Sequence, residues 1–142
     1  MIAETWQEVW RNGISPCLST AELEVLRDAL EKDDRRLVQG TVTFPPPLQV
    51  LEEHPVERAC ALGFCGWQAD HLATVAEVEE FFARICSEVG QRLGDPAACR
   101  WFLNWFDETP RPEMRRKLLT EVRESLAERA EPFRSARSPS AA

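Results

Sequence analysis

The sequence is poor in the side chains that most enzymes use to transfer protons. It has no tyrosine and two histidines, His54 and His71, among 142 residues. The nucleophile motif G-x-S-x-G, the phosphate loop G-x-x-x-x-G-K-[ST] and the zinc motif H-E-x-x-H do not occur in it. The composition therefore leans against an enzyme and indicates no cofactor.

One carboxylate pair remains a candidate for catalysis. Asp107 and Glu108 follow Trp105, and an aromatic wall can raise a carboxyl pKa. The simpler interpretation, which we favour, is that both carboxylates end a helix in solvent.

Long apolar runs are also missing. No segment approaches the roughly 18 to 20 apolar residues that a helix needs to cross a bilayer. The first residues, MIAETWQEVWRNG, contain acids and tryptophans where a signal peptide needs a basic start and an apolar run. The cysteine count is five, an odd number, which favours a reduced compartment over a disulfide framework. We expect a water-soluble cytoplasmic protein with no membrane partner.

Positive charge is scarce over most of the chain, whose net charge is -7. Residues 1–109 contain 19 Asp/Glu and 9 Lys/Arg, whereas residues 110–142 contain 5 Asp/Glu and 8 Lys/Arg. The acidic part would repel a phosphate backbone, so nucleic acid is a disfavoured partner. Binding of nucleic acid would depend on the last helix, through Arg111, Arg115, Arg116, Lys117 and Arg123.

What the chain does contain is apolar residues at helical spacing, 44% of the total, with Pro- and Gly-marked turns between them. Ser19 with Glu22, and Thr74 with Glu77, have the spacing of capping boxes that begin helices. The second box predicts a long helix over residues 75–93, ended by Gly94. Together these features predict an all-α fold, a compact bundle of about five to seven helices.

Three further helices are expected. The first covers residues 3–11 and ends at Asn12 and Gly13. Another begins after Asp95, with Pro96 in its first turn, and is apolar on nearly all sides, so we expect it to be the central element. The last has an apolar stripe from Met114 to Leu126. We assign residues 1–130 to a single helical domain and residues 131–142 to a flexible, disordered tail.

Residues 37–49 do not fit a helix. Thr41 to Thr43 are a β-branched patch, but no second strand candidate is available to pair with them. Pro45, Pro46 and Pro47 follow, so we expect an extended, proline-rich connection with room for a short helical turn over residues 48–53.

The stretch from His54 to His71 has the spacing H-x5-C-x4-C-x5-H, and its four side-chain types are those that bind zinc. Zinc sites usually pair cysteines two to four residues apart, whereas Cys60 and Cys65 are five apart and on one helix would point about 140° apart. The alternative is close helix packing through small residues, with cysteine as a buried apolar side chain. We favour packing over a metal or thiol-redox site.

Two tryptophan pairs have helical spacing. Trp101 and Trp105 are expected in the core, and Trp6 and Trp10 lie on one face of a short terminal helix. That face either packs in its own core, which we favour, or enters a groove of a partner.

The leading hypothesis is a non-catalytic, acidic helical module, an adaptor that binds another protein or a second copy of the chain. Its interaction residues would be Trp6, Trp10, Arg115 and Arg116. The alternatives are a metal-binding or thiol-redox protein using His54, Cys60, Cys65 and His71, and nucleic-acid binding through the basic C-terminal helix.

Overall fold

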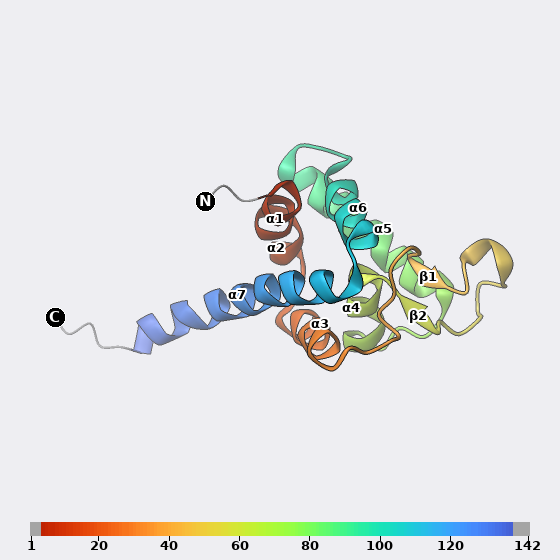
Figure 1. Ribbon diagram of the computed structural model, residues 1–142, viewed down its shortest axis with the longest axis horizontal. Coiled ribbons are helices and arrows are strands. Elements are labelled where there is room, and N and C mark those ends of the chain that lie inside the picture. Colours follow the sequence, from red (N-terminus) through yellow and green to blue (C-terminus); the bar gives the residue numbers. More distant parts are fainter. Residues whose placement is uncertain (1–3, 138–142) are drawn as a thin grey trace.

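The computed structural model describes the backbone of residues 4–137 and the side chains of residues 4–130. Most of that backbone is helical, as predicted, and α7 passes along α3 on one side of the body (Figure 1). The helical elements are α1 (Thr5–Val9), η1 (Trp10–Ile14), α2 (Ser15–Cys17), α3 (Thr20–Lys32), η2 (Pro47–Gln49), α4 (Ala61–Ala69), α5 (Val75–Leu93), α6 (Ala98–Glu108) and α7 (Arg111–Arg137). None of the described helices is long and apolar enough to cross a membrane.

The first helix does not end at Gly13, so that prediction was wrong. The chain stays helical from Thr5 to Cys17 because α1 passes through a π-helical turn, η1, into α2. A Cβ atom on Gly13 would lie 2.7 Å from Leu93 Cδ1 and 2.9 Å from Val89 Cγ1. The glycine is therefore needed for close contact between this segment and α5, rather than as a helix stop.

Both predicted capping boxes are present. Glu22 N–H donates to Ser19 Oγ at 3.1 Å, and Ser19 N–H donates to a Glu22 carboxylate oxygen at 2.7 Å. Thr74 and Glu77 repeat the arrangement at the start of α5. That helix ends at Gly94, whose φ of 68° lies in the left-handed region that glycine adopts without strain.

The prediction for α6 was wrong in two respects. The helix begins at Ala98, two residues later than Pro96, because Asp95 Oδ1 accepts the Ala97 N–H in a turn before it. It is also one-sided: Phe102 and Phe106 are buried, but Trp101 is 54% exposed. Trp101 therefore does not belong to the core.

The element enclosed on most sides is α4, whose residues 61–66 are all buried. It packs on α3, α5 and the strand that precedes it. A Cβ atom on Gly66 would lie 2.6 Å from the Phe81 ring, so the small residues of this helix do permit the close packing expected of them.

The β-branched patch does have a partner strand, contrary to the prediction. In the described chain, the sheet consists of β1 (Thr43–Phe44) and β2 (Arg58–Ala59), which pair antiparallel with Thr43 opposite Ala59. The connection between them is proline-rich as expected, with a cis peptide bond between Phe44 and Pro45, and its helical turn is the 3-10 turn η2. It projects at the end of the molecule opposite to the one from which α7 extends (Figure 1).

The predicted boundary between domain and tail falls inside α7. The backbone of this helix continues to Arg137. Residues 138–142 of the predicted tail lie outside the described residues.

Candidate interaction surface

Trp6 and Trp10 are buried, which agrees with packing in their own core. The Trp6 ring stacks on Trp105 with centroids 3.5 Å apart and planes 4° from parallel. Trp10 Nε1 donates to Ser125 Oγ on α7 at 3.1 Å. In this structure, the pair is therefore not part of an accessible surface.

The histidines and cysteines of the proposed metal cluster do not converge. Cys60 is the N-cap of α4, where its Sγ accepts the Gly63 N–H, and Cys65 Sγ donates to the Ala61 carbonyl oxygen. Burial raises the pKa of Cys60 to about 12 and that of Cys65 well above its usual value.

His54 and His71 lie outside this buried pair. His54 Nε2 lies 3.5 Å from Glu57 Oε2, and His71 is exposed. Within the described residues, no three His, Cys, Asp or Glu side chains form a metal-binding group. The four residues thus do not form the site that their spacing suggested.

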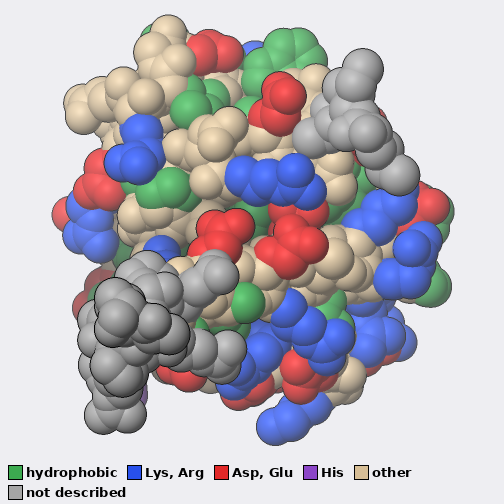
Figure 2. Space-filling view, turned by 90° about the vertical axis from the view of Figure 1, so that its left-hand side faces the viewer, with side chains coloured by type: hydrophobic (Ala, Val, Ile, Leu, Met, Phe, Trp, Pro, Cys, Tyr) green, Lys and Arg blue, Asp and Glu red, His purple; other side chains and the backbone are tan. Residues whose placement is uncertain are grey.

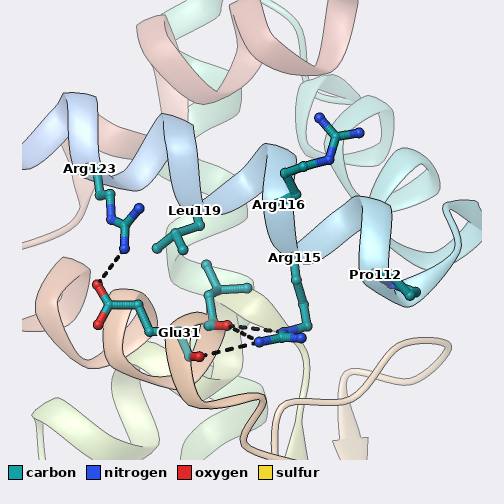
Figure 3. A pocket seen from close by; sticks show the side chains of 7 residues that line it. Glu31, Pro112, Arg115, Arg116, Leu119 and Arg123 are labelled. Carbon is teal, nitrogen blue, oxygen red and sulfur yellow. Dashed lines mark hydrogen bonds and ion pairs between the residues drawn. The ribbon is translucent and has the colours of Figure 1, made fainter.

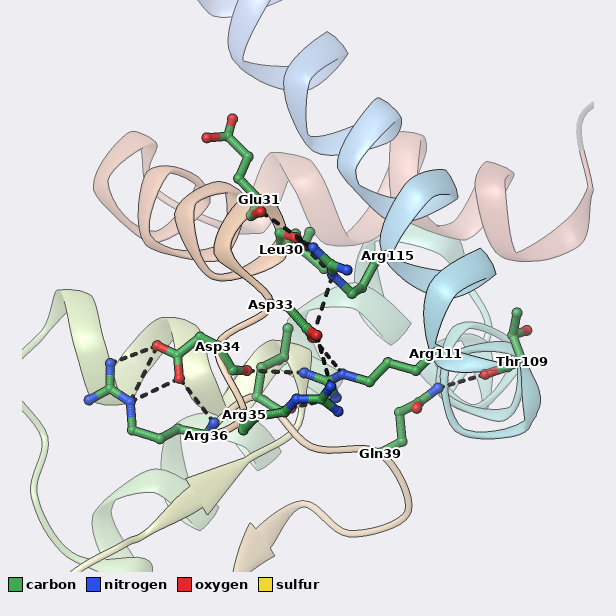
Figure 4. A network of polar contacts seen from close by, with 11 residues as sticks. Leu30, Glu31, Asp33, Asp34, Arg35, Arg36, Gln39, Thr109, Arg111 and Arg115 are labelled. Atoms are coloured by element: carbon green, nitrogen blue, oxygen red, sulfur yellow. Dashed lines mark hydrogen bonds and ion pairs between the residues drawn. The ribbon is translucent and has the colours of Figure 1, made fainter.

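Two arginines of the predicted basic helix bind the end of α3 (Figure 4). Arg111 contacts Asp33 and two backbone carbonyls, and Arg115 donates to the carbonyl oxygen of Leu30 at 2.9 Å. A helix leaves its last carbonyl groups without partners, and Arg115 donates to two of them, Leu30 O and Glu31 O, whereas the carbonyls bound by Arg111 lie just beyond the helix. Arg111 and Arg115 therefore hold α7 against α3.

The remaining basic residues do not form a continuous positive field. Arg123 pairs with Glu31 at 3.0 Å beside a hollow of about 450 Å³ between α3 and α7 (Figure 3). Arg116 lines the same hollow, is exposed and has no ion pair with a described residue. On the face in Figure 2, Lys and Arg side chains are most frequent in the lower right part, with Asp and Glu side chains among them. The acidic side chains therefore weaken the attraction of this face for a phosphate backbone.

In the carboxylate pair at the end of α6, Asp107 has a structural role. Asp107 Oδ1 accepts the Gly40 N–H at 2.9 Å, which fixes the connection after α3. Partial burial raises the pKa of Asp107, and Glu108 is exposed. Neither residue lines any of the hollows at Arg116, Cys86, Leu48 or Gln68.

The connection between β1 and β2, residues 45–57, presents an apolar surface where the sequence favoured a rigid proline-rich connector over a binding segment. We call this connection the hairpin loop. Leu48 is 100% exposed and Leu51 is 74% exposed. Of the large apolar side chains that are exposed among the described residues, Leu48, Leu51 and the adjoining Phe44 lie here, and Trp101 lies elsewhere. Such clustering is typical of an interaction site rather than of an inert surface.

Backbone hydrogen bonds hold the hairpin loop in place at its base. Val56 N–H donates to Ala73 O, and Val75 N–H donates to His54 O, both at 2.9 Å. Glu57 N–H closes the strand end by donating to Phe44 O at 2.8 Å. The loop is thus attached both to the strand pair and to the start of α5, while its leucines remain in solvent.

The hairpin loop borders a hollow of about 630 Å³. Its lining residues are Leu48, Gln49, Val50, Leu51, Glu53, His54 and Pro55. Glu52, Glu53 and Glu57 are exposed, and the one cation at this surface among the described residues is Arg58, whose guanidinium lies 5.4 Å from the centroid of the Phe44 ring at the base of the loop. The surface is therefore apolar at its tip and acidic around it.

The sequence did contain a signal for this surface. Leu48 and Leu51 lie between three prolines and two glutamates, so any helical turn that contains them is short. Apolar residues in a turn too short to pack along the helical body are candidates for exposure. Comparisons of the chain with protein-family models, with curated proteins and with solved structures give no match in any of the three.

Proposed function

We propose that this chain is a non-catalytic, acidic helical module that binds another protein through the hairpin loop, in a cytoplasmic setting. The observation that carries the proposal is the complete exposure of Leu48 at the tip of an anchored loop. The expected partner has an apolar pocket with Lys or Arg at its rim. This surface replaces Trp6 and Trp10 as the candidate docking site.

The energetic argument rests on the two leucines. Burying one leucine side chain is favourable by about 1.5–3 kcal/mol. Both leucines are in water in the free chain, so a partner that buries them gains this free energy on binding. Because the base of the loop is already hydrogen-bonded, binding needs to order few additional residues. Preorganisation of this kind lowers the entropic cost of association.

The charge around the loop selects the partner. Glu52, Glu53 and Glu57 would attract a basic rim and repel an acidic one. Two copies meeting loop to loop would bring these carboxylates together, so we expect a different protein rather than symmetric self-association through this surface.

The proposal is tested by affinity capture and site-specific crosslinking from cells that produce the chain. The wild type is compared with the double variant Leu48→Ser/Leu51→Ser and with Trp101→Ser, which removes an exposed apolar side chain outside the loop. We expect one stoichiometric protein to bind the wild type and Trp101→Ser and to be lost from the double variant. A photo-crosslinking residue at position 49 should join the same protein.

Charge supplies a second criterion. Glu52→Gln/Glu53→Gln should slow association and weaken its dependence on salt concentration. Retention of the captured protein by the double leucine variant, or absence of crosslinks from position 49, would exclude this surface. Sedimentation of the purified chain would reveal whether a second copy is the occupant instead, which would also contradict the proposal.

A further inference from the structure

The hollow between α3 and α7 combines positive charge with apolar side chains (Figure 3). It has a volume of about 450 Å³, and we call it the arginine hollow. Its lining residues include Leu30, Glu31, Arg115, Arg116, Leu119 and Arg123. Three cations and one anion therefore line it, on a chain whose net charge is -7. It shares no lining residue with the hollow at the hairpin loop.

The three arginines differ in how far their donors are already used. Arg115 is bound to the end of α3, where its Nε and Nη2 donate to Leu30 O at 3.0 and 2.9 Å. Arg123 donates through Nη2 to a Glu31 carboxylate oxygen at 3.0 Å, and its other N–H groups bond to no described residue. Arg116 turns away from α3 and has no ion pair with a described residue (Figure 3). Two guanidinium groups therefore keep donors for a ligand.

The ion pair between Arg123 and Glu31 is open to exchange. The two side chains are 59% and 37% exposed, and an ion pair in solvent contributes little to stability. A guanidinium group has five N–H donors, so Arg123 can accept a second carboxylate or exchange Glu31 for it. The pair therefore does not block the arginine hollow.

The free donors are spaced along one face of α7. Arg116 and Arg123 are seven residues apart, which is two helical turns and about 10.5 Å along the axis. Leu119 lies between them in sequence, is half-buried and packs at the edge of the core. Its side chain points toward α3 (Figure 3). The order along this face is positive, apolar, positive.

This order restricts the chemistry of the ligand. A single phosphate or a small carboxylate cannot span the two guanidinium groups. A nucleic-acid strand carries charge at every nucleotide and has no apolar group to cover Leu119, and Glu31 would repel it. A helix whose acidic residues are seven apart, with an apolar residue three or four positions after the first, repeats the same spacing with opposite charge.

We propose that the arginine hollow binds an acidic amphipathic helix of a partner protein, in which two carboxylates two turns apart flank an apolar residue. The carboxylates bind Arg116 and Arg123, and the apolar side chain covers Leu119. The bound helix lies along α7 and beside α3, which is recognition of a helix in a groove. This surface goes beyond the hairpin loop and does not depend on it.

The probe is a synthetic peptide of about 15 residues, bridged between side chains on its outer face because so short a helix is marginal alone. It carries two glutamates seven apart with leucines between them, and the control peptide has lysine in place of both glutamates. Fluorescence anisotropy measures binding to the full chain. We expect the acidic peptide to bind, the lysine peptide not to bind, and salt to weaken the complex.

The variant Arg116→Gln/Arg123→Gln should lower the affinity for the acidic peptide by at least about tenfold, because two charge-assisted contacts are lost. Arg100→Gln, which removes an exposed arginine of α6, should bind as the wild type does. Leu48→Ser/Leu51→Ser should also bind normally, which separates this test from that of the hairpin loop.

The wild-type chain supplies a readout that needs no variant. The acidic peptide should shift the methyl resonances of Leu119 and leave those of Leu48 unchanged. If the arginine variant loses its circular dichroism signal, these shifts and the comparison of the two peptides decide the question.

Four results would overturn the proposal. They are no binding of the acidic peptide at about 1 mM, equal binding of both peptides, retention of affinity by the arginine variant, and shifts confined to residues outside the hollow. Self-assembly of the chain alone that this variant abolishes would make a second copy the occupant instead. Tighter binding of a single-stranded DNA oligonucleotide, lost in the same variant, would make it nucleic acid.

Discussion

Arg111, in the first turn of α7, donates its Nε–H to Asp33 Oδ1 at 2.8 Å, and Asp33 is the left-handed residue that ends α3, with φ of 53°. The same guanidinium donates to the carbonyl oxygens of Leu37 at 2.9 Å and Asp34 at 3.0 Å. One side chain thus fixes both the end of α3 and the direction of the chain after it (Figure 4).

Replacement of Arg111 should therefore destabilise the fold. We expect Arg111→Met to lower the free energy of unfolding by on the order of 2 kcal/mol, because it removes the hydrogen bond to Leu37 O and the ion pair with Asp33. Urea denaturation measures the change. The matched control is Arg116→Met, which removes an exposed guanidinium of the same helix and should alter the free energy by less than about 0.5 kcal/mol. Equal losses for the two variants would show that the contacts of Arg111 contribute nothing specific.

The loss of stability on replacing a tryptophan should depend on how deeply its side chain is buried, and not on its spacing in the sequence. Trp6 is buried against Trp105, so Trp6→Ala should cost about 3–5 kcal/mol in free energy of unfolding. Trp101→Ala should cost less than about 1 kcal/mol, because that ring is mostly in solvent. Iodide quenching of fluorescence provides an independent measurement: Trp101→Ala should remove the most accessible emission. A large loss of stability in Trp101→Ala would contradict this assignment.

Glu22 predicts an unusual dependence of stability on pH. Burial, together with the carboxylate of Asp70, raises its pKa to about 7. Protonated Glu22 favours the folded state, so its contribution is fully present below the usual pKa of 4.5 and is lost as pH rises through about 7. Glu22→Gln keeps the capping box but cannot ionise. It should therefore flatten the fall in stability over this range, as measured by thermal unfolding at a series of pH values.

Glu77 is the matched control for Glu22, because it occupies the same position in the second capping box. Hydrogen bonds from the backbone N–H groups of Ala73 and Thr74 hold its pKa below the usual value. Ionised Glu77 therefore stabilises the fold above its usual pKa, and this contribution is lost as pH falls through the lower folded value. Glu77→Gln should destabilise at neutral pH and not in acid. If both variants had the same dependence of stability on pH, the opposite pKa shifts of Glu22 and Glu77 would be contradicted.

Short sequence motifs predicted helix starts correctly where a motif has a single structural meaning, as the capping box does. Ser19 and Thr74, each followed by glutamate three residues later, began helices as expected. Gly13 was misread because a helical glycine can serve packing as well as termination, and only the position of Leu93 distinguishes the two. Strand β2 was missed because two residues contain no period from which to identify a strand.

The candidate surfaces were harder to predict than the fold. Spacing placed Trp101 with Trp105, but α6 buries the face that contains Phe102 and leaves Trp101 exposed. The basic residues of α7 looked available for a ligand, yet Arg111 and Arg115 bind α3. Composition gives the charge of a side chain, whereas its partners depend on contacts distant in the sequence.

Strands β1 and β2 hold the two ends of the hairpin loop side by side. The helices contact the loop through backbone hydrogen bonds at its base and through Val50 and Val56, which pack on the core. Side chains of other kinds can replace its exposed leucines without rearranging the helical body, so evolution or a protein engineer can change what the molecule recognises independently of how it folds.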